Sequence, residues 1–427
     1  VEGIADGEQN ILTKDEVIYL VKSSGTTGKG KMYPFTKAYS KFILPNCITY
    51  AYIVNKLSEK KLNRNFFLML ACPFKMSKGG LRTGGMWAAI RKRNNDDVVP
   101  VLNDNIFKED PSYFVQAVFG LRDPDVGLYY AFSSDLTYAF FNYIELNRQE
   151  IYEAISSGHI KEREGLDEDI RHQLNQSLTP DPKRAKEVLA EIEKGPESLV
   201  ARLWPKLKFA TVCRGGSFAH TSAILEKTYF KETKFSMGCH AATEGIFGLS
   251  LTTEDFLKEV FTFFTSAIFL EFIKVEDMEK TNPKTYLLEE LEIGQEYEIV
   301  VTNSIGLYRN RFGDVIKVVG FTNNTPKYVF KYRTGQVLNC AYDRTPENVL
   351  YDAITKTEKE WNLQVMSYTS VENIHLDAAI GTKSRKNCYI VFMELKSDDI
   401  LKEDQEKMLE TNLMELQEFY AHYRQTD

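Results

Sequence analysis

The sequence lacks several patterns that define large classes of proteins. Its 427 residues contain six cysteines, which are scattered singly without C-x-x-C spacing, and six histidines, which form no H-E-x-x-H motif. The string Gly248-Leu249-Ser250-Leu251 does not continue as G-x-S-x-G. A thiol-ligated zinc site, a zinc protease and a serine hydrolase of that type therefore have no support. Isolated cysteines suit a reducing, cytoplasmic compartment.

A long apolar run and a basic patch are also missing. The most apolar long segment, Phe261 to Ile273, is interrupted by polar residues and is shorter than the roughly 20 residues that span a bilayer. The formal net charge is −7, and no run of basic residues forms a nucleic-acid footprint. The N-terminal residues do not have the pattern of a signal peptide. We therefore expect no membrane partner and no nucleic-acid partner, and we favour a small-molecule ligand.

What the chain does contain, near its start, is a stretch of small, hydroxyl-bearing and basic residues, Ser23-Ser24-Gly25-Thr26-Thr27-Gly28-Lys29-Gly30-Lys31. Its glycines can adopt backbone angles that turn consecutive N–H groups toward an anion. The hydroxyls and lysines add further donors. Apolar segments flank it on both sides, Val17 to Val21 and Met32 to Phe35. We interpret the stretch as a phosphate-binding loop; a mobile surface turn is the alternative.

This loop does not complete the Walker A pattern. Gly25 to Lys31 spells G-x-x-x-x-G-K, but the next position holds Met32, whose thioether is a poor ligand for magnesium. A Walker A loop also leads directly into a helix, whereas Met32 to Phe35 reads as a second strand. The next helix is predicted to begin at Thr36, a good cap residue. The loop should therefore join two strands.

Strands that end in small-residue loops and lead into helices recur over the first 250 residues. Val126 to Ala131 leads into an aromatic helix that begins near Ser134, and that helix either walls an apolar acid pocket or packs in the core. Leu207 to Val212 breaks at Arg214-Gly215-Gly216-Ser217 before another helix. Phe235 to Cys239 reads as another short strand, and the loop that follows it contains Thr243 and Glu244. This rhythm is typical of an α/β fold whose ligands lie beyond the strand ends.

The second half is richer in strands. Residues 267–273, 296–302, 307–311 and 315–319 read as antiparallel strands, and 322–326 reads as a hinge. We therefore predict a large domain over residues 1–321, with a charged helical insertion at 145–200. A small α+β domain should follow over residues 322–427.

Two acidic residues stand in loops that suit nucleotide chemistry. Glu244, in Thr243-Glu244-Gly245, is placed to hold a magnesium ion that bridges phosphates, although a lone loop glutamate is more often simply solvated. Gly313 is expected to tighten a turn that presents Asp314, whose carboxylate can accept two ribose hydroxyls. The alternative there is a hairpin turn with an ion pair from Arg309 or Arg311.

Taken in order, these segments resemble the adenylate-forming superfamily, to which firefly luciferase belongs. They more closely resemble the Gretchen Hagen three (auxin-responsive) family of acyl-acid amido synthetases. The matching family patterns are S-S-G-T-T/S-x-G-x-x-K, G-S before a helix, the second ATP motif, F-E-F and Y-R-x-R-x-G-D-V-x-x-V-x-G-F. They correspond here to Ser23–Lys31, Gly216-Ser217, Thr243-Glu244, Phe269–Phe272 and Tyr308–Phe321.

The resemblance implies an α/β fold with a large N-terminal adenylate-forming domain, a β-rich subdomain and a small α+β C-terminal domain. It implies that ATP and Mg²⁺ activate a small carboxylic acid as an acyl-adenylate, whose acyl group passes to an amino acid amine in a monomeric enzyme. The nucleotide-binding residues it implies are Ser23, Ser24, Gly25, Thr26, Thr27, Gly28, Ser217, Thr243, Phe269 (near the adenine), Tyr308 and Asp314 (on the ribose). It implies Glu244 as the magnesium ligand, and Arg344, Lys31 and Glu244 as catalytic residues.

Two departures from the family pattern leave alternatives open. The family's D-K-T after the hinge is here Asp343-Arg344-Thr345, which keeps the charge but changes its geometry. The family's C-terminal lysine, in a K-T/V-P-R string, has no counterpart before the last residue, Asp427, so either the end is missing or the second step is impaired. The alternatives are a catalytically degenerate binding or scaffold protein and an acyl thioester ligase.

Overall fold

The structure is a computed structural model that describes residues 1–22, 31–57, 64–68, 75–85, 98–100, 105–106, 108–207, 209–215, 218–334, 337–338, 345–373, 388–396, 401 and 403–426. The chain forms two compact units. The large unit comprises Val1–Arg214, Ile224–Phe312 and Ile316–Phe330. The small unit comprises Gly215–Ala223, Gly313–Val315 and Lys331–Asp427.

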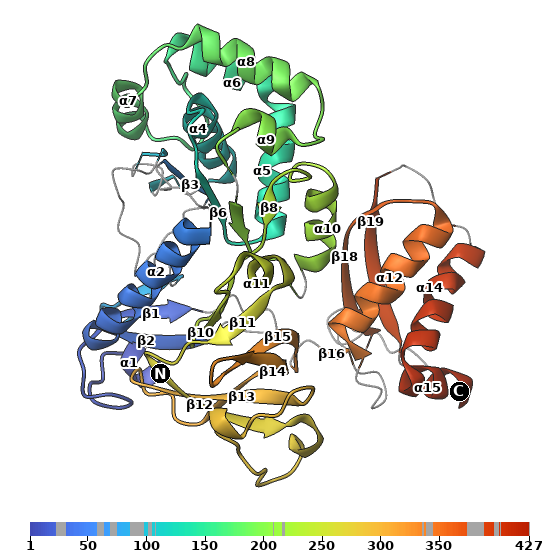
Figure 1. The fold of residues 1–427 in the computed structure, drawn as a ribbon. Coiled ribbons are helices and arrows are strands. Elements are labelled where there is room, and N and C mark those ends of the chain that lie inside the picture. Colours follow the sequence, from blue (N-terminus) through green and yellow to red (C-terminus); the bar gives the residue numbers. More distant parts are fainter. Residues whose placement is uncertain are drawn as a thin grey trace. The chain divides into compact units, whose positions relative to one another are not determined.

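A parallel sheet of four short strands lies in the large unit (Figure 1). Its order is β3 (Asn65–Leu68), β6 (Leu128–Ala131), β7 (Phe209–Val212) and β8 (Lys234–Phe235). All residues of β7 are buried, as expected for a parallel strand covered on both faces. Helices α4 (Glu109–Arg122) and α5 (Ser134–Leu146) pack with this sheet in one hydrophobic core. Ser133 caps α5, as its sequence suggests, by accepting a hydrogen bond from the Leu136 N–H.

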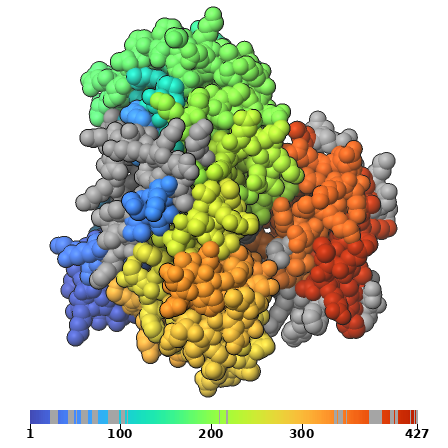
Figure 2. All heavy atoms as spheres, in the orientation of Figure 1, coloured from blue at the N-terminus to red at the C-terminus, as the bar shows by residue number. Residues whose placement is uncertain are grey.

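Helices follow one another beyond α5: α6 (Arg148–Ser157), α7 (Glu168–Ser177), α8 (Pro182–Glu193) and α9 (Leu199–Leu203). Figure 1 shows α6 and α8 side by side, and Figure 2 shows this part of the chain, in green, at the surface. The buried guanidinium of Arg184 ties α8 to its neighbours, because it donates to the carbonyls of Leu121 (2.9 Å) and Leu203 (2.7 Å). No helix in the described ranges is both long and apolar enough to cross a bilayer.

A seven-stranded sheet forms the second core of the large unit. Its order is β12 (Ile268–Lys274), β13 (Glu296–Asn303), β14 (Asn310–Thr322), β15 (Thr325–Arg333), β11 (Val260–Phe263), β10 (Gly245–Leu249) and β9 (Cys239–Ala242). Two helices interrupt the run of strands: α10 (Ala219–Lys227) lies between β7 and β8, and α11 (Thr253–Lys258) lies between β10 and β11. Aromatic rings fill the core, as where Phe263 stacks on Tyr328 with centroids 4.2 Å apart.

Three expectations about this strand-rich region were wrong. Residues 307–311 and 315–319 do not form two strands, because Asn310 to Thr322 is one strand of 13 residues, β14. The segment 322–326 is not an open hinge: it forms the turn between β14 and β15, in which Asn323 adopts φ 52°. Thr243 and Glu244 do not lead into a helix, since they form the turn of the β9–β10 hairpin. The assignment of domains to residues 1–321 and 322–427 stays a prediction.

A third sheet of the large unit carries the strands next to the proposed phosphate loop. Its order is β2 (Met32–Thr36), β1 (Val17–Lys22), β5 (Arg82–Gly84) and β4 (Lys75–Met76). β1 and β2 are antiparallel, and Lys22 pairs with Met32. The loop therefore joins two neighbouring strands, as predicted, although residues 23–30 themselves lie outside the described part. Tyr19, Val21, Tyr33, Phe35, Tyr39 and Ile305 form a core cluster that this sheet shares with the turn after β13.

Thr36 ends β2 and caps the following helix, α2 (Lys37–Leu57). Its buried Oγ1 accepts a hydrogen bond of 3.0 Å from the backbone N–H of Tyr39. This agrees with the predicted helix start. Pro45, which the sequence predicts to kink or interrupt this helix, does not end it, because α2 continues to Leu57.

The small unit has its own core. Helices α12 (Glu347–Trp361) and α14 (Glu403–Leu416) pack on the antiparallel pair β18 (Val365–Glu372) and β19 (Tyr389–Leu395). A short pair, β16 (Val337–Leu338) and β17 (Thr345–Pro346), precedes α12. The sequence predicts one closing helix over residues 398–423, but α14 ends at Leu416 and a second helix, α15 (Glu418–Thr426), follows.

Replacing the cap residue should weaken the start of α2. We expect Thr36→Ala to lower the free energy of unfolding by about 1 kcal/mol, because the Tyr39 N–H loses its acceptor. Thr36→Ser retains a hydroxyl and should stay within about 0.5 kcal/mol of the wild type. Urea unfolding followed by circular dichroism measures both. Equal losses in the two variants would contradict the capping role.

Candidate functional site

Glu244 occupies the tight turn between β9 and β10, where Ala242 pairs with Gly245. Its side chain is directed into the protein, and the residue is only 6% exposed. The carboxylate oxygen Oε1 accepts a hydrogen bond of 2.7 Å from the hydroxyl of Tyr33, on β2. The reading of Glu244 as a merely solvated loop residue is therefore wrong.

The other carboxylate oxygen of Glu244 suits a magnesium ion. Among the residues that the structure describes, none donates a hydrogen bond to Oε2. No group of three or more His, Cys, Asp or Glu side chains that could cage a metal occurs in the described ranges. Magnesium is commonly held by one or two carboxylates together with substrate phosphates and water. A single buried carboxylate with one available oxygen fits that mode of binding.

Asn303, the last residue of β13, holds the Glu244 turn from the other side. Its Nδ2 donates to the Glu244 carbonyl oxygen (2.9 Å). Its Oδ1 accepts from the backbone N–H groups of Ile305 (3.2 Å) and Leu307 (3.3 Å). One amide side chain therefore fixes both the Glu244 backbone and the turn that leads to Tyr308.

Two exposed aromatic residues lie at the same end of β13. Phe269, on β12, pairs with Thr302 and is 56% exposed. The Thr302 hydroxyl accepts a hydrogen bond of 2.9 Å from the backbone N–H of Arg309, next to Tyr308, which is 81% exposed. The structure thus brings Glu244, Phe269 and Tyr308 to one strand end, and the two aromatic rings offer faces on which a flat heterocycle can stack.

Arg309 is held in a left-handed conformation, with φ 48°. Its guanidinium donates to Glu271 Oε2 (3.0 Å) and to Thr285 Oγ1 (3.3 Å), and the Thr285 hydroxyl donates to Glu271 Oε1 (3.0 Å). These side chains link the segment of Tyr308 to β12, the strand of Phe269. The alternative interpretation paired Arg309 with Asp314, but Arg309 pairs with Glu271 instead.

Asp314 belongs to the small unit and is buried, at 2% exposure. Its carboxylate pairs with the guanidinium of Arg333, at the end of β15. The expected turn at Gly313 is wrong, because Gly313 and Asp314 lie inside β14. Gly313 has φ 96°, which is typical of a bulge, and its carbonyl oxygen accepts from the Thr334 N–H (2.8 Å).

The remaining predicted residues are only partly covered. Lys31 is exposed immediately before β2, and Thr243 is half-buried in the hairpin turn. Ser23, Ser24, Gly25, Thr26, Thr27, Gly28, Ser217 and Arg344 lie outside the described residues.

The carboxylate of the half-buried Glu259 lies beside the segment before β9. Burial raises the pKa of Glu259, while the Arg214 guanidinium and the Ser236 hydroxyl, which donates to Oε1 (3.3 Å), lower it in part. Arg214 itself donates to the Phe235 carbonyl oxygen (2.6 Å) and to Glu226 (2.8 Å). These contacts fasten the end of β7, where the Gly215–Ser217 motif begins, to the end of β8.

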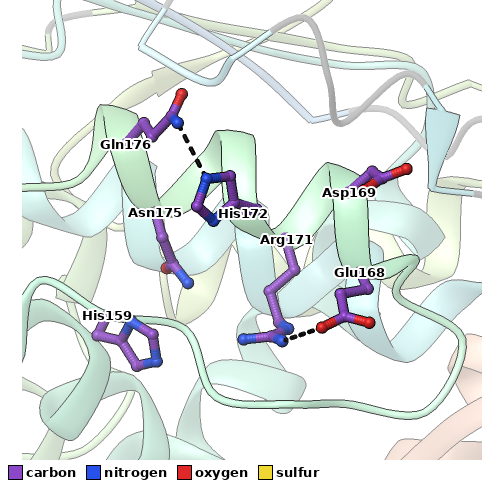
Figure 3. A pocket seen from close by; sticks show the side chains of 7 residues that line it. All are labelled: His159, Glu168, Asp169, Arg171, His172, Asn175 and Gln176. Atoms are coloured by element: carbon purple, nitrogen blue, oxygen red, sulfur yellow. Dashed lines mark hydrogen bonds and ion pairs between the residues drawn. The ribbon is translucent and has the colours of Figure 1, made fainter.

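A hollow of about 510 Å³ lies apart from these residues, among the helices after α5 (Figure 3). Its lining consists of His159, Glu168, Asp169, Arg171, His172, Asn175 and Gln176. The side chains bond to one another, as His172 with Gln176 (3.1 Å) and Arg171 with Glu168 (3.6 Å). None of them is a predicted site residue, so this hollow is not the candidate site.

The fold is shared with a solved structure of another protein. The structure matches one titled "AtGH3.15 acyl acid amido synthetase in complex with 2,4-DB" with a TM-score of 0.83. That match has 23% sequence identity and covers 97% of this chain and 74% of the other. At this identity the likeness shows the fold alone.

The sequence comparisons identify the family. A model described as "GH3 family N-terminal domain" matches residues 1–235, and one described as "GH3 family central domain" matches residues 261–333. The chain therefore belongs to the GH3 family, the Gretchen Hagen three family that the motifs suggest.

Two curated relatives are plant enzymes. The indole-3-acetic acid-amido synthetase GH3.8 of Oryza sativa subsp. indica is 31% identical over 66% of this chain, and the match spans about half of that enzyme, 47%. The indole-3-acetic acid-amido synthetase GH3.3 of Arabidopsis thaliana is 25% identical over 100% of this chain and 74% of its own length.

Sequence reasoning missed the residues that hold the site together. Tyr33 and Asn303 contact Glu244, and Thr302 and Glu271 contact Arg309, the neighbour of Tyr308. Tyr33 looked like one of the apolar residues flanking the loop. The only hint in the sequence was the polar pair Thr302-Asn303 at the end of an apolar strand. Such a pair indicates that its side chains form hydrogen bonds, but it does not show with which residues.

Gly313 should be intolerant of a side chain. We expect Gly313→Ala to lower the free energy of unfolding by about 2 kcal/mol, because φ 96° strains any other residue and the new Cβ would lie 2.5 Å from Thr334 Oγ1. Gly320→Ala, on the same strand and with open space around it, is the matched control and should be near neutral. Scanning calorimetry compares them. Similar transitions for both variants would contradict the strain.

Glu259 should make stability depend on pH. Because burial raises its pKa in the folded state, the folded protein binds this proton more tightly than the unfolded chain, whose glutamates have pKa values of about 4.3. The stabilisation it contributes should therefore fall as pH rises through the folded pKa.

Glu259→Gln removes this titration, while other groups cancel in the comparison. The stability of the wild type minus that of the variant, from urea unfolding, should be larger at pH 5 than at pH 8. A difference that stays constant or increases with pH would refute the assignment.

Proposed function

We propose that this chain is an ATP- and Mg²⁺-dependent acyl-acid amido synthetase that joins a small carboxylic acid to an amino acid. The observation that carries the proposal is the gathering of Glu244, Phe269 and Tyr308 at the end of β13. The bond from Tyr33 adds the strand that closes the phosphate loop. This combines a metal-binding carboxylate, aromatic faces for adenine and an anion-binding loop, which are the parts that a bound nucleotide requires.

In the first step a carboxylate oxygen of the acid attacks the α-phosphorus of ATP. The bond from that phosphorus to the bridging oxygen breaks, and pyrophosphate leaves with both electrons of the bond. The product is an acyl-adenylate. Its carbonyl carbon is now activated, because AMP is a far better leaving group than hydroxide.

In the second step the amino group of an amino acid attacks the carbonyl carbon. The bond between that carbon and the phosphate oxygen breaks, AMP leaves, and the nitrogen loses a proton to give the neutral amide. Nothing in either step requires a redox change. The protein's task is therefore to position charged groups and to stabilise the negative charge on phosphate.

The residues divide this task by charge. The backbone and hydroxyls of residues 23–28 and Ser217 would surround phosphate oxygens, while Lys31 and Arg344 would supply positive charge to them. Glu244 would hold the magnesium ion that neutralises the same oxygens, with Thr243 beside it in the turn. Asp314, whose carboxylate pairs with Arg333, would reach the ribose.

The names of the relatives suggest the chemical classes of the two substrates, the acid and the amine. The rice and Arabidopsis enzymes are named for indole-3-acetic acid, and another relative, from Nicotiana attenuata, is a jasmonoyl-L-amino acid synthetase. We therefore propose aryl, indole and fatty acids as the range to test against the common amino acids. We further propose that the enzyme acts as a monomer in the cytoplasm.

The first step can be measured by itself. We expect acid-dependent exchange of labelled pyrophosphate into ATP with at least one acid of an aryl, indole and fatty acid panel, and no exchange when EDTA removes Mg²⁺. Glu244→Gln should lower this exchange by about 100-fold, because the metal loses its carboxylate. Tyr129→Phe, in the other core, serves as the control variant.

The second step distinguishes the rival functions. Mass spectrometry should find the acyl-amino acid when amino acids are supplied. A thioester with coenzyme A instead of an amide would identify an acyl thioester ligase. ATP binding without exchange by any acid of the panel would identify a binding protein and refute the synthetase.

A further inference from the structure

The hydroxyl of Tyr33 makes a contact that the proposed chemistry does not itself require. It donates to Glu244 Oε1 at 2.7 Å across 211 positions of sequence. Both residues are buried, each at 6% exposure. A hydrogen bond between a phenol and a carboxylate oxygen in such surroundings is strong, so it restricts the direction in which the carboxylate points.

This bond divides the two carboxylate oxygens between two tasks. Oε1 is occupied by the phenol, whereas Oε2 receives no hydrogen bond from any residue in the described ranges. The Asn303 amide fixes the backbone of the same residue through its carbonyl oxygen. Side chain and backbone of Glu244 are thus both held, and one oxygen stays available to a cation.

The position of Tyr33 in the chain gives the contact a second consequence. Tyr33 pairs with Val21, one step from the Lys22–Met32 pair at which the two strands leave the phosphate loop. The phenol therefore connects the base of the phosphate loop directly to the carboxylate at the β9–β10 turn. A metal ion shared by Glu244 and the nucleotide phosphates needs these two elements in register.

We propose that Tyr33 is a positioning residue for magnesium, which orients Glu244 Oε2 toward the metal and ties the Glu244 turn to the end of the β1–β2 strand pair. This inference rests on the proposed function, because it assumes that Glu244 binds the ion. Ligands of metals are commonly oriented by an outer hydrogen bond, whose loss weakens metal binding by about 10- to 100-fold. Tyr33 would act through Glu244 and would not touch the metal.

The test measures metal binding and not turnover. Mn²⁺ replaces Mg²⁺, and its free concentration is read by electron paramagnetic resonance in the presence of α,β-methylene-ATP, which cannot be cleaved at the reacting bond. We expect Tyr33→Phe to weaken Mn²⁺ binding about tenfold. Binding of the analogue in EDTA should stay within about twofold of the wild type, because the ring and the strand pairing remain.

A matched variant controls for the loss of a buried phenol. Tyr129→Phe also removes the hydroxyl of a buried tyrosine, which bonds to Thr137 Oγ1 (3.3 Å), but Tyr129 lies in the core of the parallel sheet. It should bind Mn²⁺ as the wild type does. A double-mutant cycle supplies a second criterion: in a Glu244→Gln background, Tyr33→Phe should change Mn²⁺ affinity less than about twofold.

The outcomes separate this inference from the proposed function. If the wild type binds Mn²⁺ with the analogue and Tyr33→Phe binds it equally well, the positioning role is refuted and the synthetase proposal stands. A structural effect would look different. Tyr33→Phe would then weaken binding of Mn²⁺ and binding of the metal-free analogue equally, and its loss of Mn²⁺ affinity would add fully to that of Glu244→Gln. In that case the inference fails. If the wild type binds neither Mn²⁺ nor the analogue, both proposals fall.

Discussion

The candidate site in the large unit is built around one buried carboxylate, that of Glu244. Moving an ionised glutamate out of water is costly unless hydrogen-bond donors or a cation replace the lost hydration. Glu244 receives one donor from β2, and its backbone carbonyl receives another from the end of β13. The strand beside the phosphate loop, the β9–β10 hairpin and the seven-stranded sheet therefore meet around a single charged side chain.

The end of β13 is where this arrangement becomes a site. The residues Thr302 and Asn303 each bond to a different partner, so one strand end positions the Glu244 turn and the segment of Tyr308, opposite Phe269. The Arg309–Glu271 pair keeps that segment in a left-handed conformation that would otherwise be strained. Rigid strands thus carry groups that a nucleotide must find preformed, since electrostatic stabilisation depends on donors that do not need to reorganise.

Prediction from sequence succeeded where the signal was local. The antiparallel strands on either side of the phosphate loop and the cap at Thr36 follow from residue types within a few positions of one another. It failed where neighbouring strands decide the outcome. Gly313 reads as a turn in sequence, but the strands beside it extend β14 through it. The segment 322–326 likewise has the composition of a linker and folds as a hairpin turn.

From the sequence alone came the order of the motifs, and with it the GH3 family and the predicted roles of Glu244, Phe269 and Tyr308. Only the tertiary structure decided which residues hold them, because Tyr33 and Glu244 are separated by 211 positions and neither shows a pattern that names the other. Hydrophobic periodicity and turn chemistry report which face of an element is buried. They contain no information on which distant side chain completes a hydrogen bond once the sheets have packed.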